Sequence, residues 1–114
     1  MTAITALTAQ NTQGVFGIHE VPTDFIKQQI SLVAEDIGVD VVKTGMLHNI
    51  AVIDTVVSAL QLHCPKAAIV VDPVMIAKGG QALLQPEAGT ALKNKLLKLA
   101  TVLTPNLPEA EALV

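Results

Sequence analysis

Four short apolar runs in this chain each end in a compact polar cluster. The clusters are Gln10–Thr12 after the run at 4–8, Lys43–Met46 after 39–42, Asp72–Pro73 after 67–71 and Thr104–Asn106 after 102–103. Continuous apolar runs of this kind are typical of strands in a parallel sheet. In open α/β sheets, ligands bind beyond the carboxyl ends of such strands. The pattern therefore predicts one composite polar site for a small molecule.

The alternation of strand and helix signals predicts an α/β fold, a parallel sheet with flanking helices. Strands are expected at 2–9, 39–43, 67–71 and 101–104, with a glycine-punctuated loop or short edge strand at 13–19. Helices are expected from Pro22 to Gly38, after Asn49, over 86–98 and from Asn106 onward. The four strands would form one parallel sheet with two open edges, which other parts of the protein or another chain should cover.

Helical spacing predicts which side chains of the three longer helices face the core. The expected buried residues are Ile26, Ile30, Val33 and Ile37 in the first helix, Ile50, Ile53, Val57 and Leu60 in the second, and Ala88, Leu92, Leu96 and Leu99 in the third. Gly38 is expected just beyond the first helix, where glycine commonly ends helices.

Composition argues against several classes of function. The net charge is −3, every basic residue is a lysine, and only two residues are aromatic, which argues against nucleic-acid binding. No apolar stretch is long enough for a membrane span, and no signal peptide is evident, so a cytoplasmic protein is expected. The single cysteine, Cys64, excludes an intrachain disulfide and is expected to be a partly buried small residue. The abrupt ends indicate that residues 1–114 form a single, incomplete domain.

Two acidic positions have both a functional and a structural interpretation. Asp72 follows a buried strand, where a carboxylate needs a cation or several donors, and Mg²⁺ with phosphates would serve. It could equally accept hydrogen bonds from the loop that follows. Asn106 and Glu109 have the spacing of a capping box at a helix start. A carboxylate there could also order water around a metal ion.

The amide and thioether candidates are also open to two interpretations. Gln10 and Asn11 can donate to and accept from a heterocycle, or can satisfy the backbone of a turn. Met46 can contact a planar ring or fill the core. Lys43 can attract phosphate or extend into water. The chain contains no P-loop, dinucleotide-binding or serine-hydrolase motif.

Four segments of the chain, in order, resemble the hydroxymethylpyrimidine/phosphomethylpyrimidine kinases of thiamine biosynthesis. These are ITALTAQNTQGV at 4–15, VKTGML at 42–47, VDPVMIAK at 71–78 and TPNLPEAEAL at 104–113. The resemblance implies a partial ribokinase-like fold. It also implies ATP- and Mg²⁺-dependent phosphorylation of 4-amino-5-hydroxymethyl-2-methylpyrimidine and then of its monophosphate.

The resemblance also assigns roles to residues. Gln10 would hydrogen-bond the pyrimidine, and Met46 and Val74 would contact its ring. The remaining candidates, Asp72, Asn106 and Glu109, would lie near phosphate and Mg²⁺, with Asp72 and Glu109 reaching the metal indirectly.

The family's glycine-rich N-terminal segment is absent, as is the half that carries its anion hole and most of its nucleotide site. No catalytic residue is therefore expected within this chain, which should be inactive alone. The alternatives are a pyridoxal or pyridoxine kinase relative and a non-catalytic fragment. A homodimer is the expected assembly. Neither a nucleic acid nor a membrane is expected as a partner.

Overall fold

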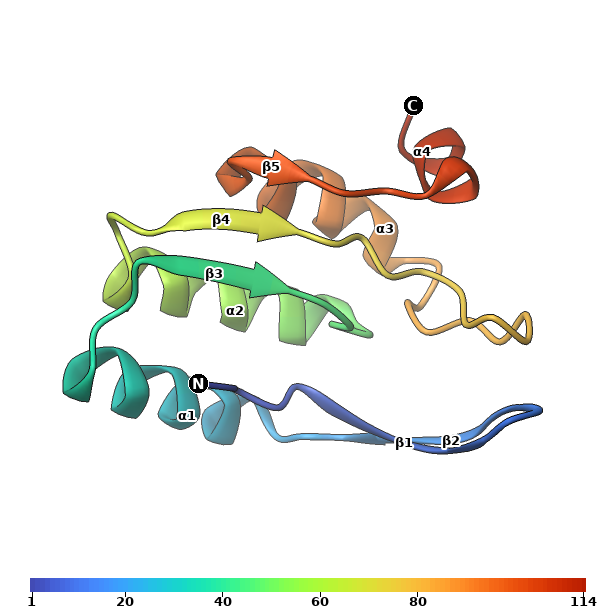
Figure 1. Cartoon of the computed structure of the whole chain (residues 1–114), viewed down its shortest axis with the longest axis horizontal. Helices are drawn as coiled ribbons and strands as arrows, with labels where there is room; N and C mark the ends of the chain where they lie inside the picture. Colours follow the sequence, from blue (N-terminus) through green and yellow to red (C-terminus); the bar gives the residue numbers. More distant parts are fainter.

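The computed structural model describes residues 1–114, which form a three-stranded parallel sheet, a row of helices and a separate β-hairpin (Figure 1). The strands of the sheet are β3 (Val41–Thr44), β4 (Ala68–Val71) and β5 (Val102–Leu103). The hairpin consists of β1 (Ala6–Asn11) and β2 (Gly14–Glu20). The helices are α1 (Thr23–Asp36), α2 (Ile50–His63), α3 (Ala88–Ala91) and α4 (Leu107–Leu113). An α/β fold with a parallel sheet is confirmed.

The sheet has the order β3-β4-β5, with all neighbouring strands parallel. Val42 pairs with Ile69, and Thr44 pairs with Val71, which in turn pairs with Leu103 on the other side. Each connection between these strands passes through a helix, as parallel pairing requires. The strands therefore end at the same edge, on the right-hand side of Figure 1.

The prediction that the first strand belongs to a four-stranded parallel sheet is wrong. The strand begins at Ala6 rather than residue 2, and β1 pairs antiparallel with β2, with a shift of register between Ala9 and Gln10. The reversal is stabilised by Asn11, whose side-chain Oδ1 accepts hydrogen bonds from the amides of Gln13 (2.9 Å) and Gly14 (3.3 Å). An Asn side chain that holds a turn in this way folds the chain back onto itself. The segment 13–19, expected as a loop or short edge strand, contributes the second strand.

Helix ends follow the capping signals in the sequence. Asn49 caps α2, since its side chain accepts a hydrogen bond from the amide of Val52 at 2.9 Å. Gly38 lies just beyond α1 with φ of 79°, a left-handed conformation that glycine adopts without strain. The helix predicted over 86–98 is less regular. After α3, residues Leu92–Leu96 form a π-helical turn (η1) and Leu97–Leu99 a 3₁₀ turn (η2).

The core lies between the helices and one face of the sheet. The predicted inward residues Ile26, Ile53 and Leu96 are completely buried, and Ile30, Leu60, Ala88 and Leu92 are also buried. Val33, Val57 and Leu99 are only partly buried. Ile37 and Ile50 are wrong as core residues, with exposures of 69% and 39%. Ile37 lies after the last turn of α1, and the buried face of α2 is turned toward Val52, Val56 and Ala59.

Burial along β3 and β4 alternates, and both residues of β5 are exposed, so only one face of the sheet is covered. Thr44, Ile69 and Val71 are buried beneath the helices, whereas Val41 and Val102 are 59% and 49% exposed. Continuous apolar strands thus carry side chains with very different surroundings on their two faces. None of the helices combines the length and the hydropathy that a membrane span requires.

Candidate functional site

Three of the four predicted polar clusters lie at one edge of the parallel sheet. Because Thr44, Val71 and Leu103 are paired in register, the residues that follow them leave the sheet side by side (Figure 1). The amide of Asp72 donates to the carbonyl of Thr44 at 3.1 Å, and the amide of Thr104 donates to that of Val71 at 3.0 Å. The ladder therefore extends one residue past the strands and fixes the start of each loop. These loops form the rim of the candidate site.

Asp72 projects from the central strand of this rim. Its side chain is about one-third exposed, and Lys43 on β3 places Nζ 3.9 Å from its Oδ2. No hydrogen bond from the following loop reaches the carboxylate, and only the Asp72 backbone carbonyl accepts one, from the amide of Val74 at 2.9 Å. The structural interpretation, in which the following loop donates hydrogen bonds to the Asp72 carboxylate, is therefore wrong. The carboxylate is left facing one exposed lysine and solvent.

Asn106 and Glu109 form the predicted capping box at the start of α4. Asn106 Oδ1 accepts from the Glu109 amide at 2.9 Å, and Glu109 Oε2 accepts from the Asn106 amide at 3.0 Å. Pro108 lies in the first turn, where a missing N–H costs little. Glu109 is 8% exposed, so its carboxylate is held in place by the cap. The structural interpretation of this pair is confirmed, and any second role toward a metal remains a prediction.

Gln10 reaches the same side of the molecule from the hairpin rather than from the sheet. It lines a polar cavity of about 470 Å³ between the hairpin turn and the loop that contains Lys78 and Gly79. The Gln10 side chain is exposed, and its Oε1 accepts a hydrogen bond from the hydroxyl of Thr8 at 2.9 Å. No hydrogen bond or ion pair joins Gln10 to Met46, Asp72 or Glu109. Its role in a shared site therefore stays a prediction.

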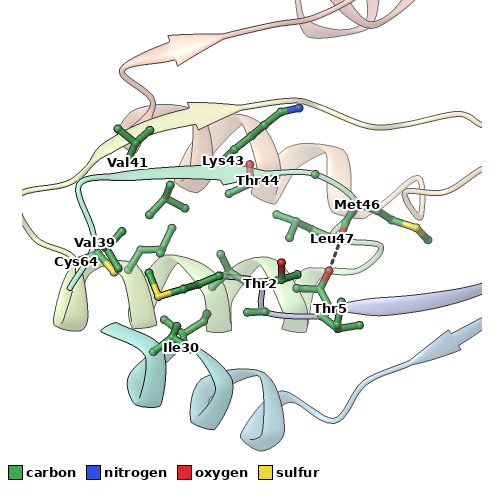
Figure 2. Close-up of a pocket in the computed structure, with 18 of the residues that line it drawn as sticks. Thr2, Thr5, Ile30, Val39, Val41, Lys43, Thr44, Met46, Leu47 and Cys64 are labelled. Carbon is green, nitrogen blue, oxygen red and sulfur yellow. Dashed lines mark hydrogen bonds between the residues drawn. The ribbon is translucent and has the colours of Figure 1, made fainter. Parts of the chain in front are cut away.

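Met46 and Val74 are both half-buried beside the rim. Figure 2 shows the Met46 side chain pointing past the end of β3, while its backbone carbonyl accepts a hydrogen bond from the Thr5 hydroxyl. This bond ties the segment before β1 to the end of β3. Neither residue is buried in the main core, so both are available to contact a ligand.

An apolar groove of about 430 Å³, which no pattern in the sequence indicates, lies along the free edge of β3 (Figure 2). It is bounded by residues 1–6, α1, α2 and β3, and fourteen of its nineteen lining residues are hydrophobic. Cys64 lines it and is 6% exposed, as expected for a buried small residue. Burial raises the pKa of the Cys64 thiol. Thr44 also lines the groove, and its buried hydroxyl has no hydrogen-bond partner.

The site contains no preformed metal cage. No group of three or more His, Cys, Asp or Glu side chains is close enough to hold an ion. Asp72 and Glu109 supply only oxygen donors, which suits Mg²⁺. Mg²⁺ commonly binds through one or two carboxylates, water and substrate phosphates, so this donor set fits a phosphate-bound ion rather than a resident one.

Comparison with known proteins identifies the family. The family model for phosphomethylpyrimidine kinase matches residues 1–114. The chain belongs to the phosphomethylpyrimidine kinase family. It is 53% identical over 111 residues to hydroxymethylpyrimidine/phosphomethylpyrimidine kinase of Haemophilus influenzae, covering 97% of this chain and 41% of that protein.

Solved structures of relatives agree with this assignment. The crystal structure of phosphomethylpyrimidine kinase from Clostridium difficile 630 matches 100% of this chain and 49% of that one, at 47% identity and a TM-score of 0.89. An ADP complex of Bacillus subtilis pyridoxal kinase matches 99% of this chain and 43% of that one, at 37% identity and a TM-score of 0.81. The fold is therefore that part of a ribokinase-like kinase fold which phosphomethylpyrimidine kinases share with pyridoxal kinases. The chain spans less than half the length of these relatives.

Proposed function

We propose that this chain provides the pyrimidine-facing rim of a thiamine-biosynthetic kinase. The reaction would be ATP-dependent phosphorylation of 4-amino-5-hydroxymethyl-2-methylpyrimidine, followed by phosphorylation of the monophosphate. The observation that carries this proposal is the family match over all 114 residues. The common edge of β3, β4 and β5 supports it, because the residues that follow those strands leave the sheet together.

Substrate recognition would come from one polar and two apolar side chains. The Gln10 amide can both donate to and accept from the ring nitrogens and amino group of a pyrimidine. Its exposure on the hairpin leaves it free to do so once the hairpin lies over the rim. Met46 and Val74, half-buried beside the rim, would contact the flat face of the ring.

Phosphate handling would fall to the acidic end of the rim. Asp72, Asn106 and Glu109 would lie near the phosphates of ATP and their Mg²⁺, with Asp72 and Glu109 reaching the ion through water. When bound, Mg²⁺ neutralises charge on the transferred phosphoryl group. Within this chain, the Glu109 carboxylate is already fixed by the cap, which lowers the cost of ordering it around a ligand. We assign no catalytic residue to these 114 residues.

The decisive test is a choice of substrate by the whole kinase that carries this chain. We expect ATP-dependent phosphorylation of the hydroxymethylpyrimidine and little turnover of pyridoxine. Gln10→Leu should raise KM for the pyrimidine at least tenfold, because a site that loses one hydrogen bond to a buried ligand group loses about that factor. Gln61→Leu, on the exposed side of α2, is the matched control. Turnover of pyridoxine alone would move the protein to the pyridoxal-kinase branch, which the Bacillus subtilis structure keeps as the second candidate.

A separate measurement concerns the 114-residue chain by itself. We expect it not to phosphorylate the pyrimidine, and we expect it in the cytoplasm. The free edges of β3 and β5 make a homodimer the predicted state, because unpaired strand edges favour association. Sedimentation of the purified chain distinguishes monomer from dimer. Turnover at the rate of the whole kinase would contradict the proposal that catalysis needs further residues.

A further inference from the structure

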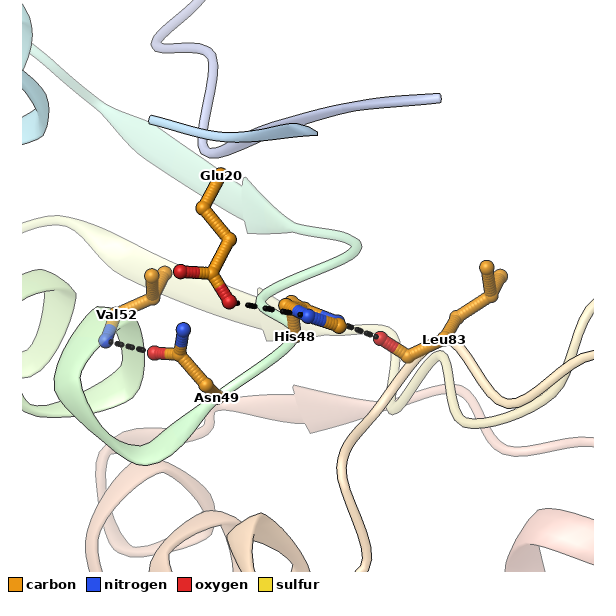
Figure 3. Close-up of polar contacts among 5 residues, drawn as sticks. All are labelled: Glu20, His48, Asn49, Val52 and Leu83. Atoms are coloured by element: carbon orange, nitrogen blue, oxygen red, sulfur yellow. Dashed lines mark hydrogen bonds and ion pairs between the residues drawn. The ribbon is translucent and has the colours of Figure 1, made fainter. Parts of the chain in front are cut away.

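His48 connects three parts of the molecule that are distant in sequence (Figure 3). It lies in the loop between β3 and α2, two residues past Met46. Its ring Nδ1 is 2.8 Å from the carbonyl oxygen of Leu83, and its ring Nε2 is 3.3 Å from Oε1 of Glu20 at the end of the hairpin. Its own carbonyl accepts a hydrogen bond from the Gln85 amide at 2.7 Å. One residue thus joins the rim, the hairpin and the 83–85 segment.

The backbone of His48 is held in an unusual conformation to make these contacts. Its φ is 67°, and it is the only non-glycine residue of the chain with a positive φ. A left-handed conformation is strained at a residue other than glycine and persists only where surrounding contacts enforce it. The side chain is 12% exposed, so the ring is enclosed between its two partners. The strain is consistent with a role that requires this ring at this place.

The chemistry of the two partners determines which form of the ring fits. A backbone carbonyl and a carboxylate are both acceptors, and a neutral imidazole has only one N–H to offer. Both contacts are hydrogen bonds only when the ring carries two protons. The hairpin contributes Glu20 to its surroundings, the 83–85 segment carries no titratable side chain, and its own loop contributes the neutral amide of Asn49.

We propose that His48 is a positioning residue which, when doubly protonated, straps the hairpin and the 83–85 segment to the end of β3. The hairpin carries Gln10, and Leu83 lines the polar cavity beside it. Closing the strap therefore fixes the base of the hairpin beside the end of β3. Losing the ring proton releases the hairpin while the backbone bond to Gln85 remains. The strap stands on geometry alone, and only its consequence for pyrimidine binding rests on the proposed function.

The test uses nitrogen NMR of the ring and amide hydrogen exchange of the 114-residue chain, so it needs no substrate. The NMR spectrum identifies the pH range in which both His48 ring nitrogens carry a proton. Because exchange of any amide is base-catalysed, each rate is divided into the rate of an unfolded amide at the same pH to give a protection factor. Loss of the second ring proton should lower the protection factors of the β1–β2 amides roughly three- to tenfold. The protection factor of the Gln85 amide should change little over the same range. A strap that depends on the ring proton predicts this difference between the two amide groups.

Two variants separate the strap from general loss of structure. His48→Gly accepts a positive φ without strain, so it removes the ring and keeps the backbone. It should give low hairpin protection factors at every pH. Glu20→Gln should give the same hairpin behaviour and leave the ring bound to Leu83.

The matched control is His63→Gln. His63 makes a similar contact, 3.5 Å from Glu35, but on the helices away from the rim. It should leave hairpin exchange as in the unmodified chain. Hairpin protection factors that are independent of pH, or unchanged in both His48→Gly and Glu20→Gln, would overturn the proposal. A kinase inactive on pyrimidine would leave these exchange results untouched, so the two proposals fail separately.

Discussion

The β1–β2 hairpin and the β3–β5 sheet are both built from short strands, but different forces hold them in place. The sheet lies on a core in which Ile26, Ile53 and Val71 are completely buried. No residue of the hairpin, from Ala6 to Glu20, is buried. Burial of apolar area supplies most of the free energy of folding, so the sheet is fixed by the core. The hairpin depends on a few polar contacts at its ends and can move without unfolding the rest.

Packing around the hairpin turn shows how few those contacts are. The side chain of Gln81 lies between Gly14 and Gly79, and its Oε1 is buried without a partner. At the other end, the contact between His48 Nε2 and Glu20 Oε1 holds the last residue of β2. Near the start, Gln29 in α1 exchanges two hydrogen bonds with the backbone of Ile4, at 2.8 and 2.9 Å. The region that carries the predicted pyrimidine contact is therefore the least firmly anchored.

The largest effect in the chain should come from its core. Ile53→Ala removes a completely buried side chain beneath the sheet and should lower the free energy of unfolding by about 2–5 kcal/mol. Leu62→Ala, on the same helix but 73% exposed, should change it by less than about 0.5 kcal/mol. Urea unfolding followed by circular dichroism measures both. Equal effects would mean that the helices and sheet do not share the core described above.

Much of the sheet could be predicted from the sequence, and the hairpin could not. Strands at 39–43 and 67–71 are marked by apolar runs between clear helix caps, and parallel order follows from the helices between them. The first apolar run looks the same, but the strand that it forms, β1, pairs with β2, which begins only three residues after β1 ends. What decides its partner is the Asn11 side chain that closes the turn, a local contact that competes with the sheet.

The candidate site, too, could be predicted from the sequence only in part. The capping box of Asn106 and Glu109 is a spacing, and spacing is visible in a sequence. The order of residues also placed Asp72 at a strand end. By contrast, His48 has no such signal, because its positive φ and its two partners come from segments about 30 residues away on either side. Contacts of that kind depend on tertiary structure alone.

Crowding at the hairpin turn offers a way to disturb the hairpin without disturbing the sheet and its core. A Cβ on Gly79 would lie 2.7 Å from Gln81 Oε1 and 3.3 Å from the carbonyl oxygen of Gln13. Gly79→Ala should therefore push the loop and the hairpin apart and speed exchange of hairpin amides, with the urea midpoint nearly unchanged. Gly89→Ala has open space around its Cβ and lies in α3, so it should stabilise the chain by up to about 1 kcal/mol. A large fall in the urea midpoint for Gly79→Ala would show that the hairpin is part of the cooperative core.

The pH dependence of the Cys64 thiol tests how firmly the core holds the sheet, in contrast to the hairpin. Burial raises the pKa of its thiol, so the folded state favours the protonated form. The resulting stability is fully present below the pKa of the unfolded thiol and is lost as the pH rises through the higher folded value. Alkylation of Cys64 should therefore be much slower in the folded chain than in urea at mildly alkaline pH. Equal rates would mean that the groove beside Cys64 opens readily, which would make β3 as mobile as the hairpin.

The smallest effect should come from the one ion pair at the rim. Lys43→Ala removes an exposed lysine 3.9 Å from Asp72 and should change the free energy of unfolding by less than about 1 kcal/mol. Lys95→Ala, which breaks the closer contact of 2.6 Å to Asp54, is the comparison variant, and both changes can be followed in urea. Because Asp72 directly follows β4, which packs on the core, the position of Asp72 should not depend on Lys43. If Lys43→Ala is the more damaging of the two, charge rather than burial holds the end of the sheet, and the rim would then resemble the hairpin.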